Sequence, residues 1–483
     1  MKTVHCVLLT LLLATAVLAQ GPALRWAEWY SVPSNPTGFA RAVIEIEGGR
    51  LVATGWCRDY FDTHPDDHEK VFVICVDTSG QEIWSRVHEF PDQNAEAWTI
   101  QRTPDAGYVL AATANEPSAG ASVSYLMKLD SLGEEEWRQG YGSPPAFYLP
   151  VIGGHTSDGG YFIASTLRVE DDNDFRLTRI NADRSVRWTE TYGGAGQQTL
   201  YAAVRMPDDG FLLVGTTHVS PQQGRDAYVV KVDSAGDSVW SHTYGGPADE
   251  IPSDLALMPD GGFVIVGGSE DQFVIRADSG GDTLWTRSLT HLPRLEVHSV
   301  AVTRDTGIVV AGSISRSSLL DSLAVLIKLD ANGVEEWTSL LTAEYYGFGA
   351  YDVVQTEDAG FALAGKSHAA VEPSFCLALT YPDPTLPVEP GNVPSVPALY
   401  AMCAFPNPFN PTTTISFALP RAGRVTIAVF DLLGREVEML TDATYPAGEH
   451  RISFDGSHLP SGLYFARLES GPFTATQKLL LLK

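Results

Sequence analysis

The stretch DGGFVIVGG at residues 260–268 recurs in modified form along most of the chain. Each copy also contains a segment such as YVVKVD (228–233) and one such as SVWSHTYGG (238–246). Seven tryptophans mark the copies at intervals of 45 to 55 residues: Trp29, Trp84, Trp137, Trp188, Trp240, Trp285 and Trp337. A repeat of this length is typical of a solenoid, a propeller or another array of one supersecondary unit.

Each copy contains four short segments with strand character. The segment after the glycine pair is almost continuously apolar and rich in β-branched residues, as in FLLVGT (211–216), IVVAGS (308–313) and FALAGK (361–366). Such segments indicate strands that are covered on both faces.

The two ends of the repeat region indicate how the array closes. The chain starts with a lone tryptophan segment, LRWAEWYSV (24–32), and the last copy ends at FCLALT (375–380) without one. We expect the first segment to supply the fourth strand of the last copy, which removes an open sheet edge. The prediction is an all-β chain with a seven-bladed β-propeller over residues 20–380. An open β-solenoid is the alternative, but it would not need a permuted start.

Turn residues recur at fixed distances before the tryptophans. An aspartate lies seven residues before five of them, at Asp77, Asp130, Asp233, Asp278 and Asp330, and Asn181 takes that place in the third copy. A glycine lies four residues before the tryptophan in the same five copies, and Arg184 takes that place in the third copy. Aspartate and glycine at these places predict hairpin turns rather than a metal or substrate site. We expect the turn at Arg184 to differ.

The first 19 residues have the features of an export signal. Lys2 supplies a positive start, an apolar stretch follows at 7–14, and Val17 and Ala19 are small residues at the −3 and −1 positions. The pattern predicts cleavage after Ala19, so that Gln20 begins the mature chain. No other run approaches 18 apolar residues, so no transmembrane segment is predicted in the mature chain.

The net charge limits the classes of binding partner, and the cysteine positions indicate whether disulfide bonds form. The formal net charge of −27 argues against nucleic acid and anionic membranes and is compatible with cations, basic proteins or neutral sugars. After the predicted cleavage, the cysteines at 57, 75, 376 and 403 do not form a disulfide framework, and buried free thiols are expected.

The last 80 residues differ from the repeats. Residues 381–403 contain six prolines and predict an extended linker. The segments FPNPFNPTT (405–413), FDLLGREVEML (430–440), PAGEHRISFDG (446–456) and LPSGLYFARL (459–468) then alternate strands and turns, which predicts a small sandwich at 404–483. In order and content these motifs closely resemble the type A C-terminal sorting domain of type IX secretion. The closing TQKLLLLK, with Lys478 and Lys483, fits the lysine-rich end of that family.

The resemblance implies an Ig-like sandwich that directs a periplasmic protein across the outer membrane through the secretion machinery. In the family the domain is then usually removed, and the cargo is anchored to surface polysaccharide or released. The expected location is therefore secreted or outer-membrane surface, via the periplasm. The alternative is an Ig-like module used for adhesion. Residues 24–380 resemble secreted bacterial propeller repeat proteins with a YGG…DGG…KLD…W pattern. This resemblance implies a propeller fold and an extracellular location, but no particular activity.

No GxSxG, HExxH, Walker or CxxC motif is present, and no catalytic or cofactor-binding residue is predicted. We expect a secreted or cell-surface scaffold that binds a glycan or a protein. The alternative is a secreted hydrolase or lyase with its site at the propeller's central channel. The run DDND offers Asp171, Asp172 and Asp174 as calcium ligands, with an exposed acidic tip as the alternative. His64 and His68 could bind zinc from one helix face, but Pro65 disfavours that helix.

Overall fold

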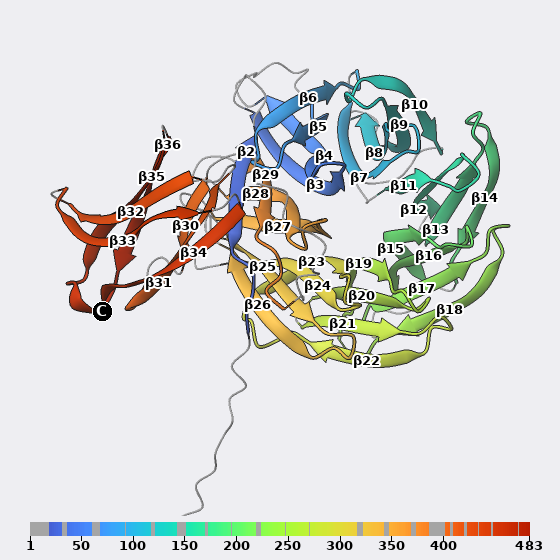
Figure 1. Cartoon of the computed structure of the whole chain (residues 1–483). Helices are drawn as coiled ribbons and strands as arrows, with labels where there is room; N and C mark the ends of the chain where they lie inside the picture. Colours follow the sequence, from blue (N-terminus) through green and yellow to red (C-terminus); the bar gives the residue numbers. More distant parts are fainter. Residues whose placement is uncertain are drawn as a thin grey trace, which may run out of the picture. The chain divides into compact units, whose positions relative to one another are not determined.

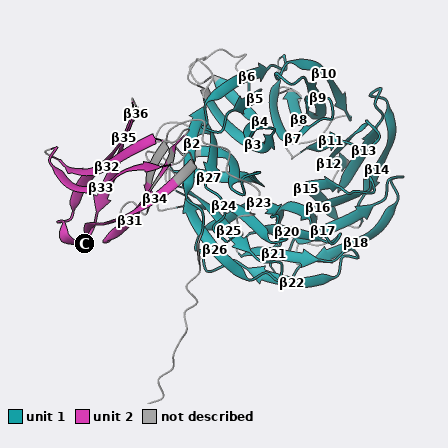
Figure 2. Ribbon diagram, in the orientation of Figure 1, with its two compact units in different colours: residues 1–386 teal, residues 387–483 magenta. Residues whose placement is uncertain are grey.

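The computed structural model describes residues 19–30, 36–59, 68–91, 93–116, 121–142, 151–169, 172–194, 196–218, 224–246, 248–269, 271–315, 322–341, 347–368, 373–385, 401–405, 409–419, 423–432, 434–445, 448–471 and 473–483. Its regular structure is β-strand, apart from one 3-10 turn at Gly456–His458. The chain divides into two compact units, residues 1–386 and 387–483 (Figure 2). The all-β prediction is confirmed.

The first unit contains seven sheets, six of four strands and one of five, here called blades 1 to 7; the four strands of each blade are given from the innermost outward. Blade 1 is β3 (Pro36–Ile46), β4 (Arg50–Asp59), β5 (Lys70–Val76) and β6 (Glu82–His88), and blade 2 is β7 (Asn94–Arg102), β8 (Tyr108–Glu116), β9 (Ala121–Leu129) and β10 (Glu135–Tyr141). Blade 3 is β11 (Ile152–His155), β12 (Tyr161–Val169), β13 (Asp172–Ile180) and β14 (Val186–Tyr192), and blade 4 is β15 (Gln197–Arg205), β16 (Phe211–His218), β17 (Asp226–Val232) and β18 (Ser238–Tyr244). Blade 5 is β19 (Pro252–Leu257), β20 (Phe263–Gly268), β21 (Gln272–Ala277) and β22 (Thr283–Ser288), and blade 6 is β23 (Leu295–Val302), β24 (Ile308–Ser315), β25 (Ser322–Leu329) and β26 (Glu335–Leu341). Blade 7 is β27 (Phe348–Gln355), β28 (Phe361–His368), β29 (Pro373–Thr380) and β2 (Leu24–Tyr30).

The blades form a ring that the N-terminal strand closes, as the sequence predicts (Figure 1). Strand β2 pairs antiparallel with β29, from Leu24 opposite Thr380 to Tyr30 opposite Phe375. The innermost strands of blades 7 and 1, β27 and β3, are also in contact. Seven sheets with this closure fit a seven-bladed propeller.

The pairing register corrects the assignment of the first repeat tryptophan. In the other blades the tryptophan follows a bulge near the start of the outermost strand, as at Trp84, which pairs with Cys75. In blade 7 the residue after that bulge is Trp26, opposite Leu379, whereas Trp29 lies further along, opposite Cys376. Trp26 is therefore the repeat tryptophan, and the assignment of Trp29 was wrong.

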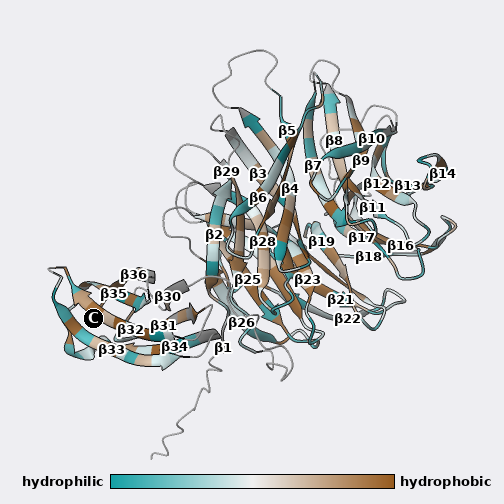
Figure 3. Cartoon of the chain, turned by 45° about the horizontal axis from the view of Figure 1, so that its top comes forward, coloured by the Kyte–Doolittle hydropathy of each residue, from teal (hydrophilic) through white to brown (hydrophobic). Residues whose placement is uncertain are grey.

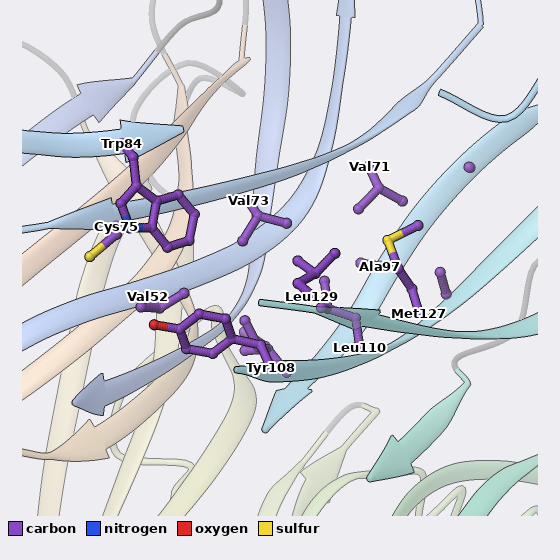
Figure 4. Close-up of a cluster of buried hydrophobic side chains, with 14 of the residues drawn as sticks. Val52, Val71, Val73, Cys75, Trp84, Ala97, Tyr108, Leu110, Met127 and Leu129 are labelled. Atoms are coloured by element: carbon purple, nitrogen blue, oxygen red, sulfur yellow. The ribbon is translucent and has the colours of Figure 1, made fainter. Parts of the chain in front are cut away.

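Each junction between neighbouring blades holds a cluster of buried apolar side chains. Seven such clusters together cover the whole ring. Figure 4 shows the junction of blades 1 and 2, where Val73 lies near Tyr108, Leu110 and Leu129. Burying one such side chain stabilises the fold by roughly 1.5–3 kcal/mol. Apolar residues accordingly run along the strands of the blades (Figure 3). Strand β25 is wholly buried, while outermost β22 is mostly exposed.

The recurrent aspartates cap hairpin turns, as predicted. Asp77 Oδ1, for example, accepts hydrogen bonds from the backbone N–H groups of Ser79 and Gln81, at 2.8 and 3.0 Å. The turn at Arg184 does not differ in its backbone, so that expectation was wrong. Arg184 adopts a φ of 72° and donates its N–H to the carbonyl of Asn181, as the glycines do in the other turns. Its guanidinium lies 5.6 Å from the Trp137 ring, a favourable contact that offsets the cost of the left-handed conformation.

The recurrent tryptophan, tyrosine and glycine link each outer strand to the next blade. The Trp26 and Trp285 indoles donate to turn carbonyls of the following blade, at 3.0 and 3.1 Å. The Tyr30 and Tyr244 hydroxyls do the same, both at 2.6 Å, to Gly80 and Gly281. The turn glycines pack against the preceding blade's aromatic ring, so a Cβ there would collide with it. The motif Asp-x-x-Gly…Trp is thus an inter-blade clamp.

The recurrent basic residue of the third strand and the first aspartate of DGG form ion pairs inside a blade. Lys128 contacts Asp105 at 2.9 Å, and Lys328 contacts Asp305 at 2.7 Å. The hydroxyl of Thr103 and the Lys128 ammonium hold the pKa of Asp105 down, at about 2. These charged repeat positions therefore stabilise the blades, and functional residues must be sought where the copies differ.

Residues near the predicted cleavage site form an added strand in blade 6. Strand β1 (Ala19–Gln20) pairs parallel with β26 at Trp337 and Thr338. The Trp337 side chain is fully buried there, and its indole donates to Asp383 at 3.0 Å.

The second unit consists of two antiparallel sheets that share one core. One contains β30 (Ala401–Phe405), β31 (Thr412–Leu419) and β34 (Gly448–Asp455); the other contains β33 (Glu436–Tyr445), β32 (Gly423–Asp431), β35 (Gly462–Ser470) and β36 (Phe473–Leu481). Buried residues of both sheets, including Ile415 and Phe454 from the first and Val429 and Leu479 from the second, form a single cluster. This cluster is the unit's own hydrophobic core.

Candidate binding site on the innermost strands

The innermost strands surround the axis of the ring (Figure 1). The pairing register shows a bulge in six of these seven strands over their described residues. A bulge leaves one residue outside the ladder and re-aims its side chain. The bulged residues differ from blade to blade: Arg41, Trp98, Tyr201, Ser253, His298 and Tyr351. This variation contrasts with the repeated turn and clamp residues.

Four of these bulged residues, together with Phe39 and Lys366, form a continuous stack across blades 6, 7, 1 and 2. His298 stacks on Tyr351 with ring centroids 4.1 Å apart, and Tyr351 meets Phe39 edge-on at 4.5 Å. The Arg41 guanidinium then lies between the rings of Phe39, at 4.0 Å, and Trp98, at 4.3 Å. We call these six residues the axial arc.

Hydrogen bonds to the second strands of blades 2 and 6 hold the two end residues of the axial arc in place. The Trp98 indole donates to the Thr113 hydroxyl at 3.1 Å, and His298 Nε2 lies 3.0 Å from the Ser313 hydroxyl. Burial, reinforced by Lys366 and Arg41, lowers the pKa of His298 to about 4. His298 is therefore neutral at pH 7, and its ring can exchange hydrogen bonds without adding charge.

The two cations of the axial arc differ in their partners. Arg41 contacts the buried carboxylate of Glu96 at 2.5 Å. Lys366 contacts the ring faces of Phe39 and Tyr351, at 5.2 and 5.5 Å, and pairs with no carboxylate among the described residues. Burial first, and then the charge of Arg41, lower the pKa of Lys366. The axial arc therefore places aromatic rings beside an ammonium group that has no counter-ion within the described part of the chain.

Two partly buried carboxylates, Asp254 on β19 and Asp352 on β27, also lie on innermost strands. Ser299 Oγ is 2.9 Å from Asp254 Oδ2 and 3.0 Å from Asp352 Oδ1. Asp352 Oδ2 in turn accepts the backbone N–H of Val43 at 2.8 Å, which links blade 7 to blade 1. The one hydroxyl proton of Ser299 can be donated to only one carboxylate at a time, and burial raises the pKa of Asp254 to about 7, which favours its protonated form below neutral pH. This relay joins blades 5, 6, 7 and 1.

The predicted site residues do not gather at the axial arc. Asp174 lies in β13 with its side chain against Gly193, while Asp171 and the side chain of Asp172 lie outside the described residues. His64 also lies outside them. Among the residues that the structure does describe, no group of three or more His, Cys, Asp or Glu could hold a metal ion. The calcium site therefore stays a prediction.

The remaining predicted residues can be placed individually. Ala19 and Gln20 form β1, Lys478 pairs with Phe465 in the second unit, and the Lys483 ammonium donates to the Ser457 carbonyl at 2.6 Å. Cys75 and Cys376 are buried free thiols, as expected, Cys57 is also buried, and the side chain of Cys403 is not described.

One residue of the axial arc could have been found in the sequence, because it departs from the repeat rather than matching a known motif. In the second strands, Lys366 stands where the other copies have Trp56, Thr113, Thr166, Thr216, Gly268 and Ser313. It is the charged residue of that set. Comparing the copies position by position for departures from the repeat would have singled it out.

A family match identifies the type of domain at the C-terminal end of the chain. Residues 403–482 match the family described as the secretion system C-terminal sorting domain. The tail is a type IX sorting domain. It indicates export to the cell surface or secretion, as predicted from the motifs. No helix among the described residues is both long and apolar enough to cross a membrane.

Comparison with other proteins adds little to this. No curated protein matches the chain. Among solved structures, the Neurospora crassa Pan2 WD40 domain is 11% identical over 75% of this chain and 96% of its own, with a TM-score of 0.48. The β-propeller domain of the Pyrococcus furiosus trilobed protease is 8% identical (71% and 93% covered, TM-score 0.43). PorZ, a surface component of the Porphyromonas gingivalis type IX system, is 11% identical (92% and 81%, TM-score 0.27). With scores below 0.5, none supports a functional argument, and the propeller follows from the strand pairings.

Proposed function

We propose that this chain is a secreted or cell-surface propeller scaffold, exported through a type IX-like system by its C-terminal domain, that binds a glycan through the axial arc. The match of residues 403–482 to the sorting domain supports export. The proposed division is a signal peptide at 1–19, a propeller at 20–380, a linker at 381–403 and an Ig-like sandwich at 404–483. The two sheets with one core in the second unit are compatible with such a sandwich.

The axial arc supports binding, because its residues depart from the repeat while the blade-stabilising residues follow it. Partly exposed aromatic rings provide flat apolar faces beside hydrogen-bonding groups, which suits the apolar face and hydroxyls of a sugar ring. A protein partner is the alternative to a glycan.

The observations do not favour the alternative of a hydrolase or lyase. Such an enzyme would need accessible acid and base groups at the axis. Among the described residues of the innermost strands, the partly buried Asp254 and Asp352 accept backbone N–H groups and Glu96 is bound to Arg41, whereas Glu296 is exposed and has no such partner. Three of these four carboxylates are engaged in structural contacts, and Glu296 alone does not supply an acid and base pair.

The test of binding is the melting temperature of the mature full-length chain with EDTA, with Ca²⁺, and with neutral and acidic polysaccharides. A ligand present at 100 times its dissociation constant adds about 2.7 kcal/mol, which is enough to detect. We expect a rise with at least one polysaccharide, and loss of that rise in Trp98→Ala. A rise with Ca²⁺ would support the predicted calcium site. The absence of any rise with the whole polysaccharide panel would overturn glycan binding.

A further inference from the structure

We propose that Lys366 recognises the acidic group of a sugar, a carboxylate or a sulfate, and thereby makes the axial arc specific for acidic over neutral glycans. This inference rests on the proposed function, because it names the class of glycan that the axial arc would bind. It is carried by the combination of one unpaired ammonium group and the aromatic rings that flank it.

The first step concerns the state of Lys366 without ligand. The side chain is partly buried against Phe39 and Tyr351, and no described carboxylate or carbonyl accepts its protons. A cation that has lost part of its hydration without gaining a counter-ion is destabilised. Several other buried basic residues of the blades, Lys128, Arg179 and Lys328 among them, have carboxylate partners. Lys366 is thus a cation that no described carboxylate pairs with, and a bound anion would provide the missing ion pair.

The second step concerns the surrounding charges. The Arg41 charge is close enough to act on Lys366, but Glu96 already compensates it at 2.5 Å. Glu296, exposed on β23, attracts Lys366 electrostatically without forming an ion pair with it. His298 is uncharged at neutral pH because burial lowers its pKa to about 4. Among the described residues of the axial arc, Lys366 is therefore the positive charge without an ion-pair partner that an incoming anion would meet.

The third step is the match to ligand chemistry. A sugar ring lying against the partly exposed Tyr351 would bring a substituent on its edge toward the ammonium group, which lies 5.5 Å from the Tyr351 ring centroid. A hydrogen bond in which both groups are charged is roughly twice as strong as a neutral one. A hydroxyl in the same place would leave the charge uncompensated. The geometry therefore favours an anionic substituent over a neutral one.

The net charge of −27 does not oppose this recognition at physiological salt. Interactions between exposed charges are screened beyond about 8 Å at 0.15 M salt. The overall charge slows the approach of an anion, whereas contact with Lys366 acts at short range. Raising the salt concentration should therefore weaken acidic-sugar binding only modestly.

The experiment is calorimetric titration of the mature full-length chain with trigalacturonate, its neutral methyl ester, and a sulfated galactose trisaccharide. We expect trigalacturonate or the sulfated sugar to bind at least tenfold more tightly than the ester, and the stronger of the two identifies the anion. Lys366→Met should lose at least tenfold in affinity for that sugar and change the ester little. Lys231→Met removes a cation from β17 in blade 4 and is the matched control. Melting curves of the two variants would show that both fold.

The outcomes separate this inference from the proposed function. Equal affinity for acidic and neutral sugars, or an equal loss for both in Lys366→Met, would overturn recognition by Lys366 and leave glycan binding intact. Binding of a neutral polysaccharide alone would do the same. Failure of every glycan in the melting and titration experiments would overturn both.

Discussion

The raised pKa of Asp254 makes the stability of the propeller fall as the pH rises. An aspartate whose pKa the fold lowers, such as Asp105, has the opposite effect. Loss of hydration raises the pKa of this carboxyl from 3.8 to about 7, and the neighbouring Asp352 adds to the effect. A folded-state pKa above the unfolded value means that the folded chain binds the proton more tightly. The resulting stabilisation is fully present below about pH 4 and disappears as the pH rises through about 7.

The magnitude follows from the two pKa values. A rise from 3.8 to about 7 corresponds to about 4 kcal/mol, at about 1.4 kcal/mol for each tenfold change in proton affinity. Between pH 5 and pH 8 the loss from this one group is about 2.5 kcal/mol. The carboxyls of Asp105 and Asp158, with pKa values of about 2, titrate below this window. Glu45, with a pKa raised by burial to about 7, contributes a loss of the same sign within it.

The assay isolates Asp254 by comparing variants at each pH. Urea unfolding of the mature full-length chain, followed by tryptophan fluorescence, gives the free energy of unfolding at pH 5, 6, 7 and 8. The stability difference between wild type and Asp254→Asn should shrink by about 2.5 kcal/mol from pH 5 to pH 8, because asparagine cannot titrate. Asp233→Asn is the control, since the equivalent turn of blade 3 already has asparagine. A difference that stays constant across the four pH values would refute the raised pKa of Asp254.

Three further predictions concern the ring itself. Tyr244→Phe removes the hydroxyl that donates to the Gly281 carbonyl at 2.6 Å, and should lower the free energy of unfolding by about 1 kcal/mol; an unchanged urea midpoint would argue against the clamp. Gly133→Ala places a Cβ 2.5 Å from the Trp84 ring at a φ of 79°, and should cost at least roughly 1–2 kcal/mol in thermal unfolding, whereas Gly194→Ala, with no atom within 4 Å, should cost little. Removing residues 20–35 exposes the edge of β29 and should produce oligomers in light scattering, and a stable monomer would contradict closure by β2.

The ring could be predicted from the sequence because its determinants are local and repeated. Each turn aspartate and each apolar second strand acts within a few residues, and seven copies reinforce one interpretation. The two wrong predictions concern positions where the strand register or a neighbouring side chain determines the structure. Trp26 and Trp29 lie three residues apart in one strand, and only the pairing with β29 identifies the repeat residue. At Arg184, the stack on Trp137 permits a backbone conformation that arginine alone would disfavour.

The axial arc could not be predicted by motif, because its members come from four copies of the repeat. Phe39 and Lys366 are separated by most of the propeller in sequence and meet only when β2 closes the ring and brings blade 7 beside blade 1. Bulges on the innermost strands also shift side chains out of the simple alternation. The physical cause of the arc is thus ring closure, which no single copy encodes.

Export by the tail is the central claim, and fractionation of cells tests it most directly. The full chain and a chain ending at residue 386 would be expressed in a bacterium with a working type IX system and in a mutant that lacks it. The account predicts the full chain on the cell surface or in the medium of the competent strain alone, and the shortened chain in the periplasm of both. Arrival of the shortened chain outside the competent cells, or of the full chain outside the mutant, would contradict it.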